Sequence, residues 1–392
     1  MRRRGLTGSF WPTRRQESLL RLALTPEIDV ERCWRELEPL EIEVLEEGTF
    51  ALLPLVHRRL EQAGVDDARL PRLAGTYRST WVRNQLQLER LPSVLEALAG
   101  AAIEPLVVGG AAVATRYYEQ LGLRPILQLE LVVAPADATR TGSVLSQHGW
   151  RISWREPGRF SRLLDESGNV AVLVNEGPSP YVAGPAGVAA TLAAFRQRAA
   201  RREVAGAEAL TLSPEDEMLL ACASGARRSV APGIQWLVDV HQIVVSGDVD
   251  AGRLAARTRA QRLAWPVHET LAYLQRTTGL DGREGVISAI GAQDTTGRER
   301  VVYRLAANGL GPLGLPPESV LEHGRQSVEE PFASAIGGLP AALSKAWGVE
   351  SVRRVPAVAM RKLLGRVRAL FTKPASQTPP RGRSRSASSS GS

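Results

Sequence analysis

The sequence predicts an α+β fold in which a small mixed β-sheet core is flanked by N- and C-terminal helical regions. Short β-prone runs, separated by turn-forming residues, are confined to residues 103–174 of the 392-residue chain. On both sides of this segment, apolar residues recur every three or four positions, which is the spacing of one face of an α-helix. The fold class therefore depends on a change of hydrophobic period in the first half of the chain.

The N-terminal helical region is expected over residues 16–100. Apolar residues gather at 19–24 and 50–62, and residues 76–98 carry a longer run at helical spacing. Pro92 lies inside the last run, where proline either kinks a helix or ends one helix and starts another. Residues 1–15 carry five Arg and no acid, and this basic start is expected to be disordered.

The α/β core is expected over residues 101–185. Alternation is clearest at residues 126–133, where Leu129, Leu131 and Val133 alternate with polar side chains, as in a half-buried strand. The predicted order is a strand at 105–108, a helix at 111–120, a strand at 126–133, a helix at 136–148 and short strands near 150–154, 159–164 and 170–174.

The C-terminal region, residues 186–345, is expected to contain helices only. Ser213-Pro214-Glu215-Asp216 has the features of a helix start: a serine cap, proline in the first helical position and acids near the positive end of the helix. Helical spacing predicts further helices at residues 233–246, 250–261, 265–278, 284–291 and 298–307.

The net charge of +8 is concentrated at the two ends of the chain. Residues 346–372 hold six basic side chains against Glu350 and are predicted to form a basic amphipathic helix. Residues 373–392, rich in Ser, Pro and Arg, are expected to be a disordered tail. Residues 16–345 carry a net charge of −6, so the body lacks the basic surface of a nucleic-acid groove.

Two partners are open for the basic helix, an anionic membrane surface or a partner protein, and packing on the acidic body is the alternative to both. No apolar run reaches the roughly eighteen residues of a membrane span. A secretory leader is not expected, because no apolar segment follows the basic start. Cys33 and Cys222 are the two cysteines, which argues against a disulfide framework and favours the cytoplasm.

The residues that carry chemistry lie between Val108 and Val133. Gly109-Gly110 follows a predicted strand and opens a predicted helix, and Gln128 and Glu130 are expected on one face of the next strand. Nucleotidyl transfer by two metals needs a pair of carboxylates so placed, able to hold two Mg²⁺ about 3.5–4 Å apart. It also needs a turn that lets the backbone approach the phosphates. Gln128 supplies only a neutral oxygen to such a pair.

This segment resembles an uncharacterised bacterial nucleotidyltransferase family of the DNA polymerase β-type superfamily. The matching residues are Gly110, Ala111, Ala112, Tyr118, Gly122-Leu123-Arg124-Pro125 and the strand Leu129–Val133. Weaker matches at Trp34, residues 52–55, Arg83-Asn84, residues 212–216 and residues 236–239 extend the resemblance over residues 20–280. The resemblance implies transfer of a nucleotidyl group from an NTP to a small-molecule or protein acceptor, with Mg²⁺ as cofactor.

The departures from the family pattern fall on the metal and phosphate positions. Gly109 stands in place of the turn lysine, and Gln128-Leu129-Glu130 stands in place of Asp-x-Asp. The later strand, residues 170–175, lacks the family's Asp and His. One carboxylate does not offset the charge of two Mg²⁺ ions, which prefer anionic oxygen ligands. The motif is therefore degenerate.

Two functions remain open. In the first, Glu130 is the surviving metal ligand, with Gln128 beside it, of a weakened enzyme. In the second, the chain is an inactive scaffold that binds a nucleotide or a partner protein. Gly109, Gly110 and Arg124 are the nucleotide-binding candidates. The glycines have an ordinary strand-to-helix turn as their alternative, and Arg124 has the role of pinning its loop through a carboxylate.

The choice between these functions depends on any acidic group outside the expected positions that points into the glycine turn. The sequence offers Glu176, just past the third short strand, and Asp165 and Glu166 in the turn before it.

Overall fold

The computed structural model describes residues 11–37, 45, 47–156, 158–178, 182, 187–225, 233–280, 284–291, 300, 340–341, 344, 351–358 and 360–361. The first ten residues, most of the helix predicted at 298–307 and the tail at 373–392 lie outside these ranges. The basic helix predicted at 346–372 is described only in part, where η6 (Val352–Arg354) leads into helical residues 355–358.

A seven-stranded mixed sheet forms the centre of the fold, with the strand order β3-β4-β5-β2-β1-β7-β6. The parallel neighbours are β2 with β5 and β1 with β7, and the other neighbours are antiparallel. The strands are β1 (Leu106–Val108), β2 (Leu129–Val133), β3 (Arg151–Glu156), β4 (Phe160–Leu164), β5 (Ala171–Glu176), β6 (Ala200–Val204) and β7 (Ala207–Thr211). The predicted α+β class, a mixed-sheet core flanked by helical regions, is confirmed.

Helices precede the sheet, as the periodicity predicts. Pro92 stands at the start of a second helix, because α4 ends at Glu89 and α5 begins at Leu91. The helices of this region are α1 (Arg14–Leu24), α2 (Val30–Glu36), α3 (Leu53–Gln62), α4 (Leu70–Glu89) and α5 (Leu91–Gly100), with the 3-10 helix η2 (Glu47–Leu52) before α3. Within the core, α6 (Gly110–Tyr117), η3 (Leu121–Leu123), η4 (Pro135–Asp137) and α7 (Ala138–Gln147) connect the strands.

The hairpin β6–β7 is a correction to the sequence prediction, which placed only helices after residue 186. Its strands join through Ala205-Gly206, and both residues have positive φ, 52° and 80°. Positive φ at both central residues is the two-residue turn that suits the twist of a hairpin. β6 is an edge strand, and its residues Arg201, Arg202 and Glu203 are exposed. Because these consecutive residues are all charged, the sequence shows no apolar alternation that would predict a strand here.

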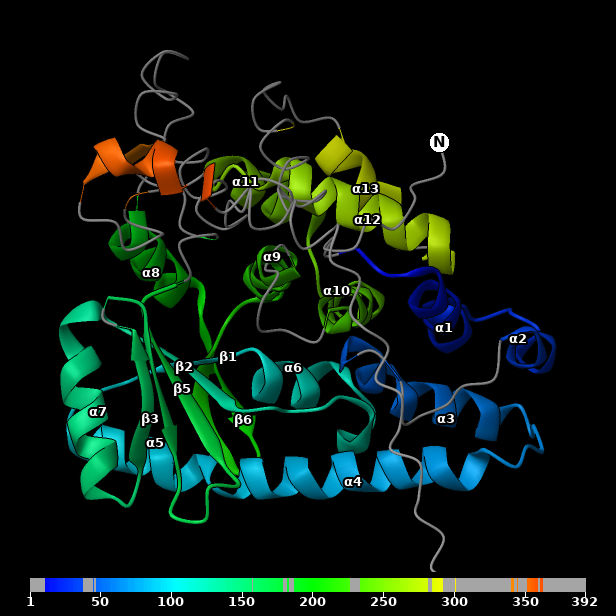
Figure 1. Ribbon diagram of the computed structural model, residues 1–392, viewed down its shortest axis with the longest axis horizontal. Coiled ribbons are helices and arrows are strands. Elements are labelled where there is room, and N and C mark those ends of the chain that lie inside the picture. Colours follow the sequence, from blue (N-terminus) through cyan, green and yellow to red (C-terminus); the bar gives the residue numbers. More distant parts are fainter. Residues whose placement is uncertain are drawn as a thin grey trace, which may run out of the picture.

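The C-terminal helices stack in layers with the rest of the molecule. Figure 1 shows α4 along one side, α6 above it, then α9 and α10, and then α11–α13. These helices are α8 (Gly187–Arg198), α9 (Pro214–Gly225), α10 (Gln235–Val245), α11 (Ala251–Ala260), α12 (Ala264–Thr278) and α13 (Glu284–Gly291). None of the described helices combines the length and the apolar character that a membrane crossing requires.

The sheet is packed on both faces. Alternate residues of β2 belong to two different apolar clusters: Val132 joins the cluster of the helical regions, and Leu129 and Leu131 join the cluster that contains α5 and α7. Helix α6 contributes to both clusters, through Val113 to the first and Ala111 to the second. The functional candidates are therefore set on a rigid scaffold, with α6 at the boundary of the two cores.

Candidate functional site

The glycine turn and Glu130 lie together, as the family resemblance requires. Val108 at the end of β1 pairs with Glu130 on β2. Gly109, the N-cap residue of α6, has φ 64° and ψ −133°, and a Cβ atom at this position would lie 2.9 Å from Cδ and Oε1 of Glu130. The Glu130 carboxylate therefore packs directly against the Gly109 backbone. Two of the departures from the family pattern, Gly109 for lysine and Glu130 for aspartate, touch each other.

The second glycine makes room for a second charged side chain. A Cβ atom at Gly110 would lie 2.9 Å from Nη1 of Arg124. Each glycine of the turn thus allows the close approach of a protein side chain, Glu130 at the first position and Arg124 at the second. The absence of side chains at this turn is accounted for by packing, which supports the ordinary-turn alternative.

Arg124 is a buried structural residue in this arrangement. Its Nε and Nη2 atoms donate to the two carboxylate oxygens of Asp239 at 2.9 and 2.7 Å, and its Nη1 donates to the Pro125 carbonyl at 2.9 Å. Burial acts to lower the pKa of Arg124, but the Asp239 carboxylate outweighs that effect and raises the pKa above its usual value. The guanidinium holds the loop before β2 to helix α10.

Three residues of the family resemblance, Asn84, Tyr118 and Asp239, meet at this ion pair. Tyr118 donates its hydroxyl to Asp239 at 2.7 Å, and Gln235 donates to the same oxygen at 3.1 Å. Asn84 on α4 donates to the Arg124 carbonyl at 2.7 Å and accepts from the Ile126 N–H at 2.8 Å. These contacts join the N-terminal helices, the core and the C-terminal helices around one loop.

The sequence placed Gln128 on the same strand as Glu130. In the structure Gln128 lies in a bend one residue before β2 begins. It therefore does not share the strand ladder with Glu130. The residues beside Glu130 on the neighbouring strands are Val108 on β1 and Leu173 on β5, which point to the same face of the sheet and are apolar. No second carboxylate is presented at the level of Glu130 on either neighbouring strand.

The three alternative acids are engaged elsewhere. Glu176 accepts the Gly158 N–H at 3.0 Å and pairs with Val133, three positions along β2 from Glu130. Asp165 accepts from the Val170 N–H at 3.0 Å and from Ser167 at 2.7 Å within its own turn.

Glu166, the third of these acids, has its Oε1 3.2 Å from the Cβ position of Gly149, in the turn before β3. Among the described residues, no group of three or more His, Cys, Asp or Glu side chains is placed to hold a metal ion. The donor set at the glycine turn is one carboxylate and therefore does not fit a two-Mg²⁺ centre.

A pocket of about 420 Å³ lies at the other end of α6, between α6, β6, β7 and α9. Sequence reasoning singled out none of its charged residues as functional: Arg116, Arg201, Arg202, Glu203 and Glu217. Burial raises the pKa of Glu217 to about 7. A sequence signal existed, because Glu217 ends a run of acids that begins at Glu215, yet helix-start acids are ordinarily exposed and favour the helix dipole.

The family assignment comes from comparison with known proteins. A family model described as "uncharacterised nucleotidyltransferase" matches residues 49–279, more than half of the chain. The chain belongs to this family. A solved structure, that of an antigenic nucleotidyltransferase-like protein from Paracoccidioides brasiliensis, is 15% identical, with a TM-score of 0.33 over 54% of this chain and 94% of that chain. No residue role is carried over at that distance, and no curated protein matches.

Proposed function

We propose that this nucleotidyltransferase-family protein binds a nucleotide and that its capacity for nucleotidyl transfer is weak or lost. The observation that carries the proposal is the single acidic group at the glycine turn. Glu130 lies there with apolar neighbours on both adjacent strands, and Gln128 lies outside β2. A single carboxylate does not neutralise two divalent cations, so the usual source of transition-state stabilisation is missing.

The position of Arg124 supports the same proposal. Its guanidinium is committed to Asp239 at 2.7 and 2.9 Å and lies beside Gly110. An arginine that binds a triphosphate needs a free fork of donors, and this fork is taken by a buried carboxylate. Arg124 therefore acts on a nucleotide only indirectly, by fixing the backbone of the turn and of the loop before β2.

Nucleotide binding itself is supported by family membership and by the start of α6. The N–H groups of a first helical turn and the helix dipole favour an anion, and Gly109 is the residue that opens this helix. Glu130 opposes a bare phosphate at the same place, because like charges repel. A nucleotide at this turn is expected to bind more tightly when the Glu130 charge is removed, unless a metal ion bridges the two.

A titration with ATP, GTP, CTP and UTP, each in Mg²⁺ and in EDTA, tests the proposal. We expect binding of at least one nucleotide that is similar in the two buffers and that Glu130→Ala leaves intact or strengthens. The matched control is Glu166→Ala, which removes an exposed acid from a distant turn and is expected to bind as the unchanged protein does.

Two outcomes contradict the proposal. Binding that depends on Mg²⁺ and disappears in Glu130→Ala, accompanied by release of pyrophosphate, identifies Glu130 as the ligand of a working metal site. Absence of binding for all four nucleotides in both buffers leaves the family fold as a scaffold for a partner protein.

A further inference from the structure

The pocket at the C-terminal end of α6 is separate from the glycine turn. Its strand residues include Arg202 and Thr211, and Thr211 pairs with Val107. Because neighbours in a ladder share a face and successive residues alternate, Val107 and Thr211 lie on the face opposite to Val108 and Glu130. The pocket and the Glu130 carboxylate are therefore on opposite faces of the sheet.

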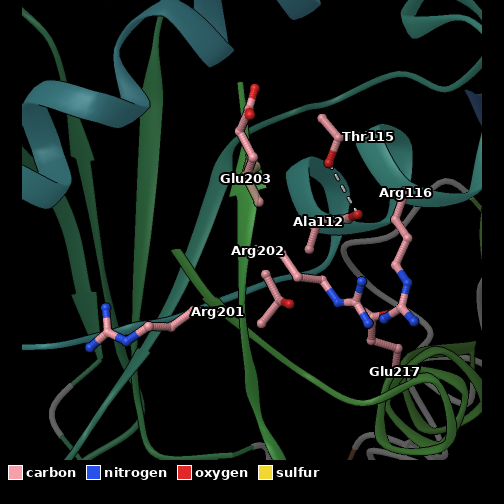
Figure 2. Close-up of a pocket in the computed structure, with 9 residues that line it drawn as sticks. Ala112, Thr115, Arg116, Arg201, Arg202, Glu203 and Glu217 are labelled. Atoms are coloured by element: carbon pink, nitrogen blue, oxygen red, sulfur yellow. Dashed lines mark hydrogen bonds and ion pairs between the residues drawn. The ribbon is translucent and has the colours of Figure 1, made fainter. Parts of the chain in front are cut away.

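Two arginines converge in this pocket. Figure 2 shows the Arg202 side chain extending toward Arg116 and Glu217, whereas the Arg201 side chain points the other way. Arg201 is paired with Glu104 and with Glu208, the latter at 3.2 Å. The Arg202 side chain makes no hydrogen bond or ion pair with any part of the chain that the structure describes, although its charge acts on Glu217.

The two arginines differ in how well they are paired. The Arg116 side chain is 13% exposed: its Nη2 donates to Asp248 at 3.1 Å, and its Nη1 donates to the Leu212 carbonyl at 3.4 Å and lies 3.6 Å from Glu217. The Nε of Arg116 has no hydrogen-bond partner among the described residues. The Glu217 side chain is 1% exposed, and its Oε1 also lacks a hydrogen-bond partner in the described chain. Arg116 thus keeps one unpaired donor beside its acidic partners Glu217 and the half-exposed Asp248, whereas the Arg202 guanidinium has no acidic partner within hydrogen-bond distance in the described chain.

We propose that this pocket binds the phosphate group of a small phosphorylated molecule between Arg116 and Arg202. A phosphate offers several acceptor oxygens to the Arg202 guanidinium and to the Arg116 Nε, the donors that have no partner in the described chain. The pocket, about 420 Å³, is larger than a single ion needs and lies within the range of small-molecule sites. Ala112 and Val204 in its lining provide an apolar surface for the rest of the molecule.

The hydroxyl groups in the wall favour a ligand that also carries donors. Thr115 donates its hydroxyl to the Ala111 carbonyl at 2.8 Å, and Thr211 donates to the Ala200 carbonyl at 3.3 Å. Each hydroxyl oxygen keeps lone pairs that accept hydrogen bonds. A phosphorylated compound with hydroxyl groups therefore suits the pocket better than inorganic phosphate does.

Titration calorimetry of the full chain with glycerol 3-phosphate, inorganic phosphate and malonate tests the proposal. We expect glycerol 3-phosphate to bind more tightly than inorganic phosphate, and malonate to bind most weakly. Arg202→Gln is expected to weaken glycerol 3-phosphate binding about tenfold or more, because a charge-assisted pair of hydrogen bonds is lost.

Arg201→Gln is the matched control. It changes the same residue type at the adjacent position of the same strand. Arg201 is among the residues that line the pocket, but its side chain points away from Arg116 and Arg202 (Figure 2). We expect this variant to bind glycerol 3-phosphate within about twofold of the unchanged protein. Equal losses in the two variants, or malonate binding as tight as that of either phosphate, overturns the proposal. Lack of saturable binding by both phosphates does so too.

Proton uptake provides a second readout that a purely structural role would not move. Glu217 contacts Tyr117 and lies 3.6 Å from Arg116 on α6, and the charges of Arg202 on β6 and Asp239 on α10 also act on it. Asp248 pairs with the same Arg116. A phosphate that takes over the two arginines withdraws the cations that stabilise the Glu217 carboxylate, so Glu217 binds a proton. Calorimetry near pH 7 in buffers of different ionisation enthalpy is expected to show this uptake, and Glu217→Gln is expected to abolish it while retaining phosphate binding. Uptake that persists in this variant contradicts the arrangement.

Discussion

Tyr117 and Tyr118 are consecutive residues at the end of α6, and each donates a hydrogen bond to a buried carboxylate. Tyr118 donates to Asp239, which also accepts from Arg124 and Gln235 at 2.7 to 3.1 Å. Tyr117 donates at 2.5 Å to Glu217, whose other oxygen has no hydrogen-bond partner in the described chain. A buried carboxylate whose two oxygens both accept hydrogen bonds holds neighbouring elements of the fold together. A buried carboxylate with one oxygen that lacks a donor can instead bind a proton or interact with a ligand.

The largest change in stability is expected when the fully hydrogen-bonded carboxylate, Asp239, is replaced. Asp239→Asn leaves the Arg124 guanidinium buried without its counter-charge, and we expect the free energy of unfolding to fall by about 3–5 kcal/mol. Denaturant titration measures this change. The matched control is Asp248→Asn, because Asp248 also pairs with an arginine but is 51% exposed, and a loss of at most about 1 kcal/mol is expected. A similar loss of unfolding free energy in the two variants would contradict the expected difference between the buried pair at Asp239 and the exposed pair at Asp248.

Glu217, the carboxylate with an oxygen that lacks a donor in the described chain, is expected to destabilise the folded protein when it is ionised. Burial raises the pKa of Glu217 from 4.5 to about 7, so between these pH values the folded state holds a proton that the unfolded state has released. Stability contributed by this group is therefore lost as the pH rises through that window.

Glu217→Gln cannot ionise, so above pH 7 it is expected to be more stable than the unchanged protein by on the order of 2–3 kcal/mol. Below pH 4.5, the ordinary value for this carboxyl, the two proteins should differ little. Unfolding measured at pH 4, 6 and 8 checks the trend. A difference that does not grow with pH would show that Glu217 is as well satisfied as Asp239.

A third carboxylate, Glu130, can be compared with Asp239 and Glu217 by substituting Gly109, the residue against which its side chain packs. We expect Gly109→Ala to lower stability by about 2 kcal/mol, because φ is 64° and the new Cβ would lie 2.9 Å from Glu130. Gly64→Ala is a matched control, since its φ is 65° with open space around it, and about 1 kcal/mol is expected there. Thermal unfolding measures both. Adding Glu130→Ala should restore the excess loss in Gly109→Ala, and failure to do so would mean that Glu130 is not held against the turn.

The smallest effects are expected at the tyrosines themselves. Tyr118→Phe removes one of several donors to Asp239 and should lower stability by about 1 kcal/mol. Tyr117→Phe removes the closest donor to Glu217, a hydrogen bond that favours the charged form, so its loss of stability should increase between pH 5 and pH 8. Urea titrations of both variants at the two pH values would show this difference. An equal pH dependence of the stability loss in the two variants would contradict the contrast between Glu217 and Asp239.

Much of the fold was predictable because its signals are local. Alternation at residues 129–133 and helical spacing before residue 100 correspond to β2 and to α4 and α5. The hairpin of β6 and β7 was missed because its first strand reads Ala-Arg-Arg-Glu-Val, where charge replaces alternation. The Ala205-Gly206 turn was the available signal, since a two-residue turn ending in glycine commonly joins two strands.

The candidate site was predictable in part. Gly109 and Glu130 meet as the family pattern requires, whereas Gln128 falls one residue before β2 begins, because the ladder with β5 starts at Leu129. The pocket at Arg116 and Arg202 could not be predicted, because alternation on β6 decides which of two adjacent arginines points into it.

The sequence by itself determined where most helices and strands form and that Gln128 and Glu130 stand where the family pattern has two aspartates, because periodicity and residue identity are local properties of the chain. Only the tertiary structure decided that Arg124 binds Asp239, 115 residues away, and that Glu217 is buried with too few partners. Such pairings depend on how layers pack, and burial sets their energies, so no local pattern contains them.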